Sequence, residues 1–212
     1  MWPKNIGEPL VAFWSKLIDT IHPADKDVLV RERHSLNTAY PPPAFIGDIR
    51  QARLFVLYAN GGYDEERSLL EFEKSGSVEA YRERLRNPVP CNVDTHPYFM
   101  KQERFRILLE AGEAAVVNAM AYRSRRISKE PDNQAVAEKL PSVKIHRNWL
   151  RSDVIPALGK VMVVVHRPSL WKLDSKTDGS EFLFFTNAVR IRICQTGLLI
   201  GRRRFCLERN DS

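Results

Sequence analysis

Three short apolar runs constrain the fold of this chain more than any other feature. They are the segments 53–59 (RLFVLYA), 114–121 (AAVVNAMA) and 161–166 (VMVVVH). None of them alternates apolar with polar residues, as a strand with one face in water would. Near-continuous apolar strands are typical of parallel sheets, which helices cover on both faces. We therefore expect these runs to form a buried parallel sheet.

Helical patterns separate the apolar runs. We expect helices over about 64–72, with Leu69, Leu70 and Phe72 on the apolar side, and over 78–86, 99–111 and 145–158. A fourth strand is predicted at 181–186, and 189–193 alternates apolar residues with arginine. Alternating strands and helices indicate an α/β protein, here a three-layer α/β/α arrangement around a central, mainly parallel four-stranded sheet.

The N-terminal part of the chain predicts one amphipathic helix that docks on the core. Residues 8–21 carry apolar residues at helical spacing, from Leu10 to Ile21. A loop over 34–50, stiffened by three consecutive prolines, follows it. The chain of 212 residues suits a single core. We therefore expect one domain, 1–212, with an N-terminal helical extension (1–40) and a core (41–212).

Composition indicates the class of binding partner and the cellular location to expect. Lysine and arginine total 33 against 26 acidic residues, and the net charge of +7 favours a polyanion such as DNA. The three cysteines are widely spaced without a zinc pattern, so neither a metal nor a cofactor is expected. No apolar run approaches the roughly 20 residues of a membrane span. We therefore expect no membrane partner and a cytoplasmic location.

Ligands of open α/β sheets bind beyond the carboxyl ends of the strands. Three segments follow the predicted strands and should meet there: 60–63 (NGGY), 121–126 (AYRSRR) and 166–169 (HRPS). Glycines 61 and 62 let backbone amides approach a ligand, and Asn60 offers both a donor and an acceptor. A plain tight turn explains the first segment equally well.

The second and third segments carry groups that suit an anion. Nucleic-acid contacts are expected from Arg123, Ser124, Arg125, Arg126 and Lys129, because guanidinium groups bind phosphate in pairs of hydrogen bonds. A generic solvated charge run is the alternative. His166 ends a strand and could reach a ligand with either ring nitrogen, although histidines in such places often have a structural role.

These segments together resemble the uracil-DNA glycosylase superfamily. The stretch 43–63, PAFIGDIRQARLFVLYANGGY, is similar to the family's opening strand and water-positioning loop. The stretch 116–123 (VVNAMAYR) is similar to its second strand, and 166–170 (HRPSL) to its His-Pro-Ser-Pro-Leu loop. The resemblance implies a sheet of order 2-1-3-4 and hydrolysis of the N-glycosidic bond of a base flipped out of the helix.

The resemblance also implies roles for individual residues. Asn60 would orient the water and His166 would steady the leaving base, as the catalytic pair. Phe45, Gly61, Gly62, Tyr63, Asn118 and Asn187 would form the base-binding pocket, and Arg167 and Ser169 would join the basic turn on nucleic acid. Asn118 would take the part of the family's base-reading asparagine. By topology, the loop of the fourth strand would lie near Asn187.

Two alternatives stay open. Gly61 stands where the family has proline, and the loop after the fourth strand has no histidine. These departures favour a non-catalytic protein of the same fold that binds a nucleotide or a protein. An unrelated doubly wound enzyme acting on a small anionic substrate is the third interpretation.

Overall fold

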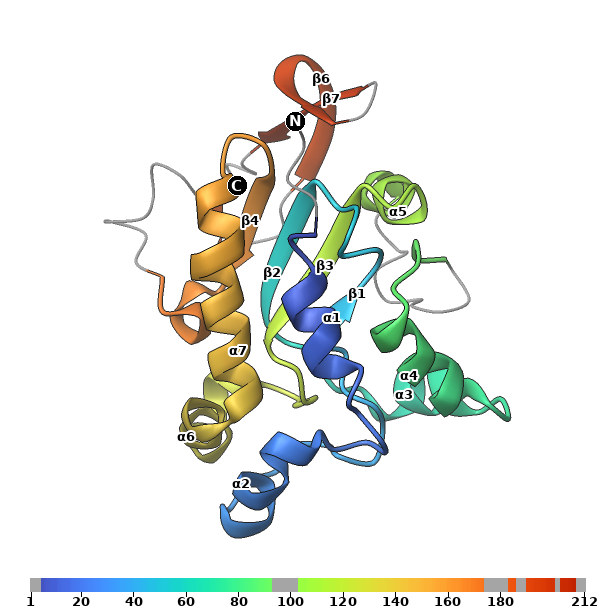
Figure 1. The fold of residues 1–212 in the computed structure, drawn as a ribbon, viewed down its shortest axis with the longest axis vertical. Coiled ribbons are helices and arrows are strands. Elements are labelled where there is room, and N and C mark those ends of the chain that lie inside the picture. The colour runs from blue at the N-terminus through green and yellow to red at the C-terminus, as the bar shows by residue number, and fades with distance from the viewer. Residues whose placement is uncertain (1–4, 93–102, 174–182, 186–189, 201–202, 209–212) are drawn as a thin grey trace.

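The protein is an α/β protein built around one mixed sheet. A computed structural model describes residues 5–92, 103–173, 183–185, 190–200 and 203–208 (Figure 1). The elements, with η marking short 3-10 or π turns, are α1 (Glu8–Trp14), η1 (Pro23–Asp25), α2 (Lys26–Arg31), β1 (Phe45–Ile46), β2 (Leu54–Asn60), α3 (Glu65–Phe72), α4 (Ser77–Arg86), α5 (Glu103–Glu110), β3 (Ala114–Met120), η3 (Ile127–Lys129), α6 (Pro131–Lys139), α7 (Pro141–Trp149), η4 (Leu150–Val154), η5 (Ile155–Ala157), β4 (Met162–His166), η6 (Pro168–Trp171), β5 (Leu183–Phe185), β6 (Arg190–Ile200) and β7 (Arg203–Glu208).

The central sheet has five strands in the order β1-β3-β2-β4-β5. β2 pairs in parallel with β3 on one side and with β4 on the other, and β4 pairs in parallel with β5. β1 pairs antiparallel with β3 and makes the sheet mixed. The expected four-stranded sheet of order 2-1-3-4 is therefore wrong for the sheet as a whole, because β1 adds a fifth, antiparallel strand at the β3 edge; the four expected strands themselves lie in the order β3-β2-β4-β5.

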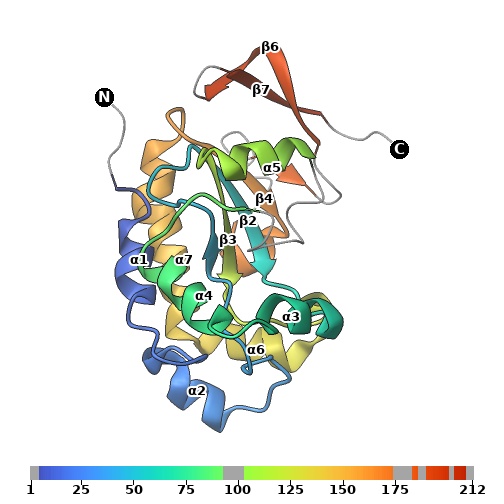
Figure 2. The same ribbon diagram turned by 90° about the vertical axis from the view of Figure 1, so that its right-hand side faces the viewer.

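Both faces of the sheet carry hydrophobic clusters, which explains the apolar runs. Alternate residues of β2 point to opposite faces. Phe55 and Leu57 belong to the larger cluster with α1 and α7, whereas Leu54 and Val56 belong to a second cluster with Leu108 and Leu109 of α5. Figures 1 and 2 show α1 and α7 side by side against the first face. The strands are thus buried from two directions, as their composition requires.

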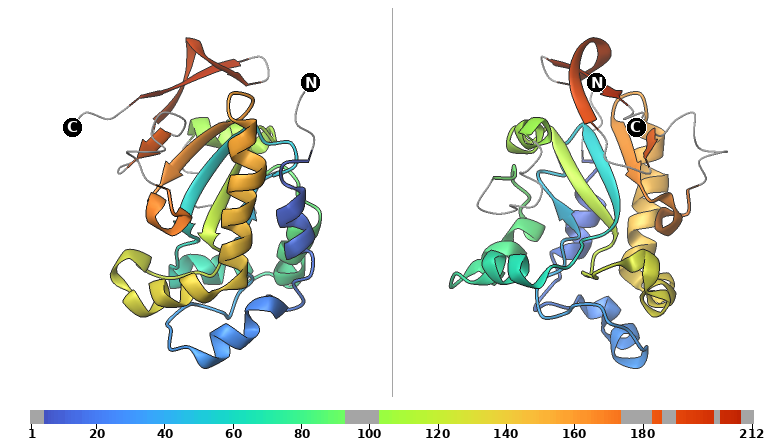
Figure 3. Two further views of the ribbon diagram at one scale, coloured as in Figure 1. Left: turned by 60° about the vertical axis from the view of Figure 1, so that its left-hand side comes forward. Right: turned by 180° about the vertical axis from the view of Figure 1, so that it is seen from behind.

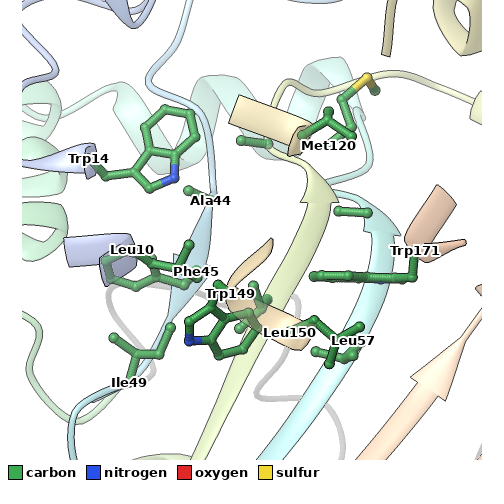
Figure 4. Packing of buried hydrophobic residues seen from close by; sticks show 14 of the residues in the cluster. Leu10, Trp14, Ala44, Phe45, Ile49, Leu57, Met120, Trp149, Leu150 and Trp171 are labelled. Carbon is green, nitrogen blue, oxygen red and sulfur yellow. The ribbon is translucent and has the colours of Figure 1, made fainter. Parts of the chain in front are cut away.

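The largest fully buried side chains of the larger cluster are aromatic (Figure 4). Trp14, Trp149 and Trp171 are each at most 2% exposed. Each indole N–H has a partner: Trp149 Nε1 donates to Ile6 O at 2.7 Å and Trp171 Nε1 donates to Tyr58 O at 2.9 Å. Trp14 Nε1 donates to His146 Nε2 at 2.7 Å. These bonds fix the orientation of large side chains that would otherwise pack less specifically.

The N-terminal helix is shorter than the sequence predicts. α1 ends at Trp14, and the chain continues through turns to η1 and α2. Leu17 is buried, but Ile18 is 67% exposed, so the helical spacing does not extend to 21. Beyond α1, the carboxylate of Asp25 accepts hydrogen bonds from Tyr122 Oη and from the Ser142 amide at the start of α7, both at 2.9 Å. The N-terminal segment is thereby tied to the central sheet.

Three other helices differ from the sequence-based expectation. α6 was not expected, and α7 begins at Pro141 before continuing into the π turn η4 and the turn η5. Figure 3 shows α6 lying below the ends of the strands, with α7 rising along the sheet. Leu69 and Leu70 of α3 are exposed, at 55% and 69%, rather than packed on the core. The first residues of the helix expected at 99–111 lie outside the described part of the chain.

A two-stranded antiparallel hairpin, β6–β7, forms a second sheet. Its register shifts between Ile193 and Leu198. Figures 1 and 2 place it at the end of the molecule opposite α3 and α6. Within the described residues, none of the helices combines the length and the apolar character that crossing a membrane demands.

Candidate functional site

The turns that follow β2, β3 and β4 meet at the carboxyl edge of the sheet. Asn60, the last residue of β2, donates from Nδ2 to Ser124 Oγ at 2.9 Å and to Ser124 O at 3.3 Å. Arg167, after β4, donates from Nη1 to Ser128 Oγ at 3.1 Å. The turn after β3 is therefore bonded to the turns on both sides, and the three segments form one surface.

The first turn is shaped by contact with the proline-rich loop. A Cβ on Gly61 would lie 2.2 Å from Cγ of Pro43, so a side chain at this position would force the loop away. Gly62 has a φ of +62°, which favours glycine. Gly61 thus allows the close approach of two loops, and Gly62 allows the left-handed backbone of the turn. Asn60 Nδ2 braces this turn, and within the described residues no hydrogen bond to Asn60 Oδ1 is found.

Arg123 has a structural partner and does not lie on the surface. Arg123 Nη2 lies 3.1 Å from Glu71 Oε2 of α3, and the two side chains are only 9% and 11% exposed. The guanidinium also lies over the ring of Phe72, 5.6 Å from its centroid. Ser124 is buried as well. The fold therefore uses both side chains to join the turn to its neighbours, and neither is exposed at the surface where a nucleic acid was expected to bind.

Arg125, Arg126 and Lys129 remain at the surface of this turn. Arg125 lies 3.6 Å from Glu65 Oε2, but both side chains are mostly exposed, so the pair contributes little and leaves the guanidinium accessible. The same guanidinium lies 6.0 Å from the ring centroid of the half-buried Tyr63. In the described residues, no ion pair involves Arg126 or Lys129. This exposed part of the turn is positively charged.

A row of three side chains crosses the sheet near the same edge. Asn118 of β3 is in register with Tyr58 of β2, and the Tyr58 ring lies 5.2 Å from the ring of His166 of β4. Tyr58 packs against the cluster on the α5 face of the sheet, so the row belongs to that face. We call Asn118, Tyr58 and His166 the polar row.

Asn118 is fully buried and only partly satisfied. Its Nδ2 donates to Pro43 O, whereas its Oδ1 is buried without a hydrogen-bond partner among the described residues. A buried acceptor without a partner is costly and is uncommon in folded proteins. Because Asn118 is 0% exposed, a ligand N–H reaches this acceptor only if the surrounding side chains open a path to it.

His166 lies half-buried at the other end of the row. Burial lowers the pKa of His166, and the neighbouring Arg167 charge lowers it further. The imidazole is therefore mainly neutral at pH 7, with one nitrogen able to donate and the other able to accept. Its ring nitrogens form no hydrogen bond within the described part of the chain, which leaves both for a ligand.

Of the predicted pocket residues, Asn118 alone belongs to the polar row, and Gly61, Gly62 and Tyr63 lie in the turn after β2. Phe45 is 3% exposed and lies in the larger hydrophobic cluster, as Figure 4 shows, so it has no surface to offer a base. Alternation along β1 turned its side chain inward. Asn187 lies outside the described residues.

A groove opens on the opposite side of the same edge. It lies between η3, α6 and η6, holds about 570 Å³ of open space, and has Ala59 of β2 among its lining residues. Arg167 and Ser169 line it, so the structure separates them from the polar row. The chain crosses from β2 to β3 on one side and then to β4 on the other. The groove therefore lies at the reversal of strand order, where α/β proteins commonly bind ligands.

Sequence reasoning missed several residues of this edge. Tyr58 was read as part of an apolar strand, although its even spacing from Asn60 could have placed it on the face opposite Leu57. Lys172 and Glu138 became part of the groove only through the turn η6 and the unexpected helix α6.

Comparison with protein-family models, with curated proteins and with solved structures found no match to this chain.

Proposed function

We propose that the protein binds nucleic acid at the carboxyl edge of the sheet and receives one unstacked base against the polar row. The observation that carries the proposal is the buried Asn118, whose Oδ1 has no hydrogen-bond partner among the described residues, on the strand whose following turn carries the exposed cations of 125–129. The proposal includes the three-layer glycosylase-like arrangement suggested by the sequence.

Charge at the edge supports a phosphate backbone as the partner. Arg125, Arg126 and Lys129 are exposed on one short turn. Glu130, the nearest acid along the chain, accepts hydrogen bonds from the Arg126 amide at 3.1 Å and from Asn133 Nδ2 at 2.8 Å. Its carboxylate is thus used within the loop. Phosphate contacts of this kind position a nucleic acid without reading its sequence.

The polar row supports recognition of a base edge. Asn118 Oδ1 can accept from a ring N–H, such as N3–H of uracil, and the Tyr58 ring offers an aromatic surface beside it. Because these groups lie at strand positions, the scaffold holds them rigidly. A base within a duplex could not reach them, so the nucleotide must leave the stack or come from a single strand.

Hydrolysis of the N-glycosidic bond is the reaction that this arrangement supports. Water adds to the sugar carbon and gives its proton to solvent, the carbon–nitrogen bond breaks, and its electrons leave with the base. In this proposal Asn60 Oδ1 orients the water, and neutral His166 donates to the departing base. No carboxylate belongs to the row, so the expected rate is low.

The test is base release from uracil-containing single- and double-stranded oligonucleotides, followed by alkaline cleavage of abasic sites. We expect the wild type to release base, Asn118→Ala to lose at least tenfold in rate, and His166→Ala to lose activity while remaining folded. Asn148→Ala is the matched control, because Asn148 is exposed on α7. Equal cleavage by Asn118→Ala and Asn148→Ala would remove the polar row from the function.

A binding protein without catalysis is the second candidate, favoured by the hydrogen bonds of Asn60. Its Nδ2 bonds only to Ser124 in the described residues, which gives Asn60 a structural reason to be present. In that case, oligonucleotides with an unpaired uracil bind more tightly than oligonucleotides with an abasic site, but no strand is cleaved. Asn118→Ala then abolishes the difference in affinity.

A further inference from the structure

We propose that the groove between η3, α6 and η6 binds the sugar-phosphate backbone of a single nucleic-acid strand that continues across the end of β2 from the polar row. This inference rests on the proposed function and extends it from one base to the strand that carries the base. Four features of the groove support it.

The groove and the polar row are adjacent across the edge of the sheet. Tyr58 of the row and Ala59 of the groove are consecutive residues of β2. Consecutive strand residues point to opposite faces, so the two sites lie back to back at one strand end. The end of β4 shows the same arrangement of consecutive residues, because His166 belongs to the polar row and Arg167 lines the groove. A strand passing over this edge can occupy both sites.

Both cations of the groove wall are held by unusual backbone conformations. Arg167 has a φ of +61° and Lys172 a φ of +55°, and these two residues flank the short turn η6. Residues other than glycine rarely adopt this region, and strained residues of this kind gather at ligand-binding sites. The turn thus carries two strained cationic residues that line the same groove.

The charges in the groove leave an excess of positive charge. Glu138 is its carboxylate, and Glu138 Oε1 lies 2.7 Å from Arg147 Nη2 and 3.1 Å from Lys172 Nζ. Arg167 bonds through one nitrogen to Ser128 and keeps further N–H donors. Two cations of the lining, Arg167 and Lys172, therefore stand against one carboxylate that Arg147 also neutralises, and the hydroxyls of Ser128 and Ser169 line the same groove. This combination suits a phosphate.

The rest of the lining suits sugars rather than bases. Ala59, Ile127, Pro131, Ala135 and Leu170 give it apolar surface, and no aromatic side chain is among the described residues that line it. Bases stack best on aromatic rings, so this lining favours the sugar-phosphate backbone over stacked bases. A nucleic-acid strand that reaches both the groove and the polar row must be longer than one that reaches the polar row alone.

The test measures fluorescence anisotropy of labelled oligo-dT of 3 to 12 nucleotides. For the wild type, affinity should rise with length until the strand spans both sites. For Arg167→Gln/Lys172→Gln, the rise should stop at a shorter length, and the longest strand should bind at least tenfold more weakly. Arg151→Gln/Lys160→Gln removes the same charge near the amino end of β4 and should behave as the wild type.

The outcomes separate this inference from the proposed function. If the Arg167/Lys172 variant matches the Arg151/Lys160 variant at every length while Asn118→Ala still loses base-dependent binding, the groove proposal is wrong and the proposed function stands. If the wild type binds no oligonucleotide at low salt, both are wrong. If free dTMP at equal phosphate concentration competes as well as the long strand does, the groove is a small-anion site and the strand proposal is wrong.

Discussion

Replacing Glu71 with leucine should destabilise the protein by about 3 kcal/mol, because the substitution leaves the Arg123 charge buried without its partner. The pair is almost fully removed from water, with an Arg123 Nη2 to Glu71 Oε2 distance of 3.1 Å. For a chain of this size, the loss corresponds to a fall of roughly 6–12 °C in melting temperature. Urea unfolding and a thermal melt both measure it.

The control is the double variant Arg123→Met/Glu71→Leu, which removes both charges and keeps apolar volume. It should recover most of the loss, because a well-packed apolar pair often replaces a buried ion pair at little cost. The opposite result, a stable Glu71→Leu variant together with an Arg123→Met variant that loses nucleic-acid affinity, would show that Arg123 serves a ligand after all.

Acidification should destabilise the protein through His146. Burial lowers the pKa of His146 to about 4, and the bond to Asn118 O opposes this only in part. Its Nδ1 lies 2.6 Å from Asn118 O and its Nε2 accepts from Trp14, so the two bonds require the neutral ring. Between pH 6.5 and 4, the His146 imidazole is protonated in the unfolded chain but remains neutral in the folded chain. Stability is therefore lost as pH falls through this window, by about 3 kcal/mol in total.

His146→Gln isolates this contribution from other titrating groups. The pKa values of His22 and His166 are also lowered by burial, and burial raises the pKa of Asp25, which acts in the opposite direction. The variant keeps these groups and removes the His146 proton. Its stability at pH 7 should be lower than that of the wild type, and the difference should shrink by about 2 kcal/mol at pH 5. A constant difference would show that His146 titrates normally.

The strands could be predicted from sequence because burial on both faces requires each of them to be a run of apolar residues. β2, β3 and β4 are covered on both faces, so each reads as an apolar run whatever lies around it. β1 was not predictable, since two residues in a proline-rich loop show no period. α6 carried a local signal, with Pro131 at its first turn and Pro141 starting the next helix, but its weakly amphipathic sequence hid it.

The place of the candidate site could be predicted from sequence, but the orientation of its side chains could not. Parallel strands bring their following turns to one edge, and this rule located Asn60, the turn 123–126 and His166 together. The rule does not say which arginine of the turn faces inward. Arg123 is buried because Glu71, 52 residues earlier, faces it, and no local pattern records that contact. Asn118 shows the reverse case, in which a residue singled out on a family resemblance has a buried Oδ1 without a hydrogen-bond partner in the described part of the chain.

The central claim is that the carboxyl edge of the sheet is a nucleic-acid surface, and the salt dependence of binding tests it most directly. For a 12-nucleotide single strand between 50 and 200 mM salt, log affinity should fall linearly with log salt, because phosphate contacts release counterions. Arg125→Gln/Arg126→Gln should reduce the slope by about 1.4, whereas Arg151→Gln/Lys160→Gln should leave it unchanged. Equal slopes for the two double variants, or an affinity that does not respond to salt, would contradict the claim.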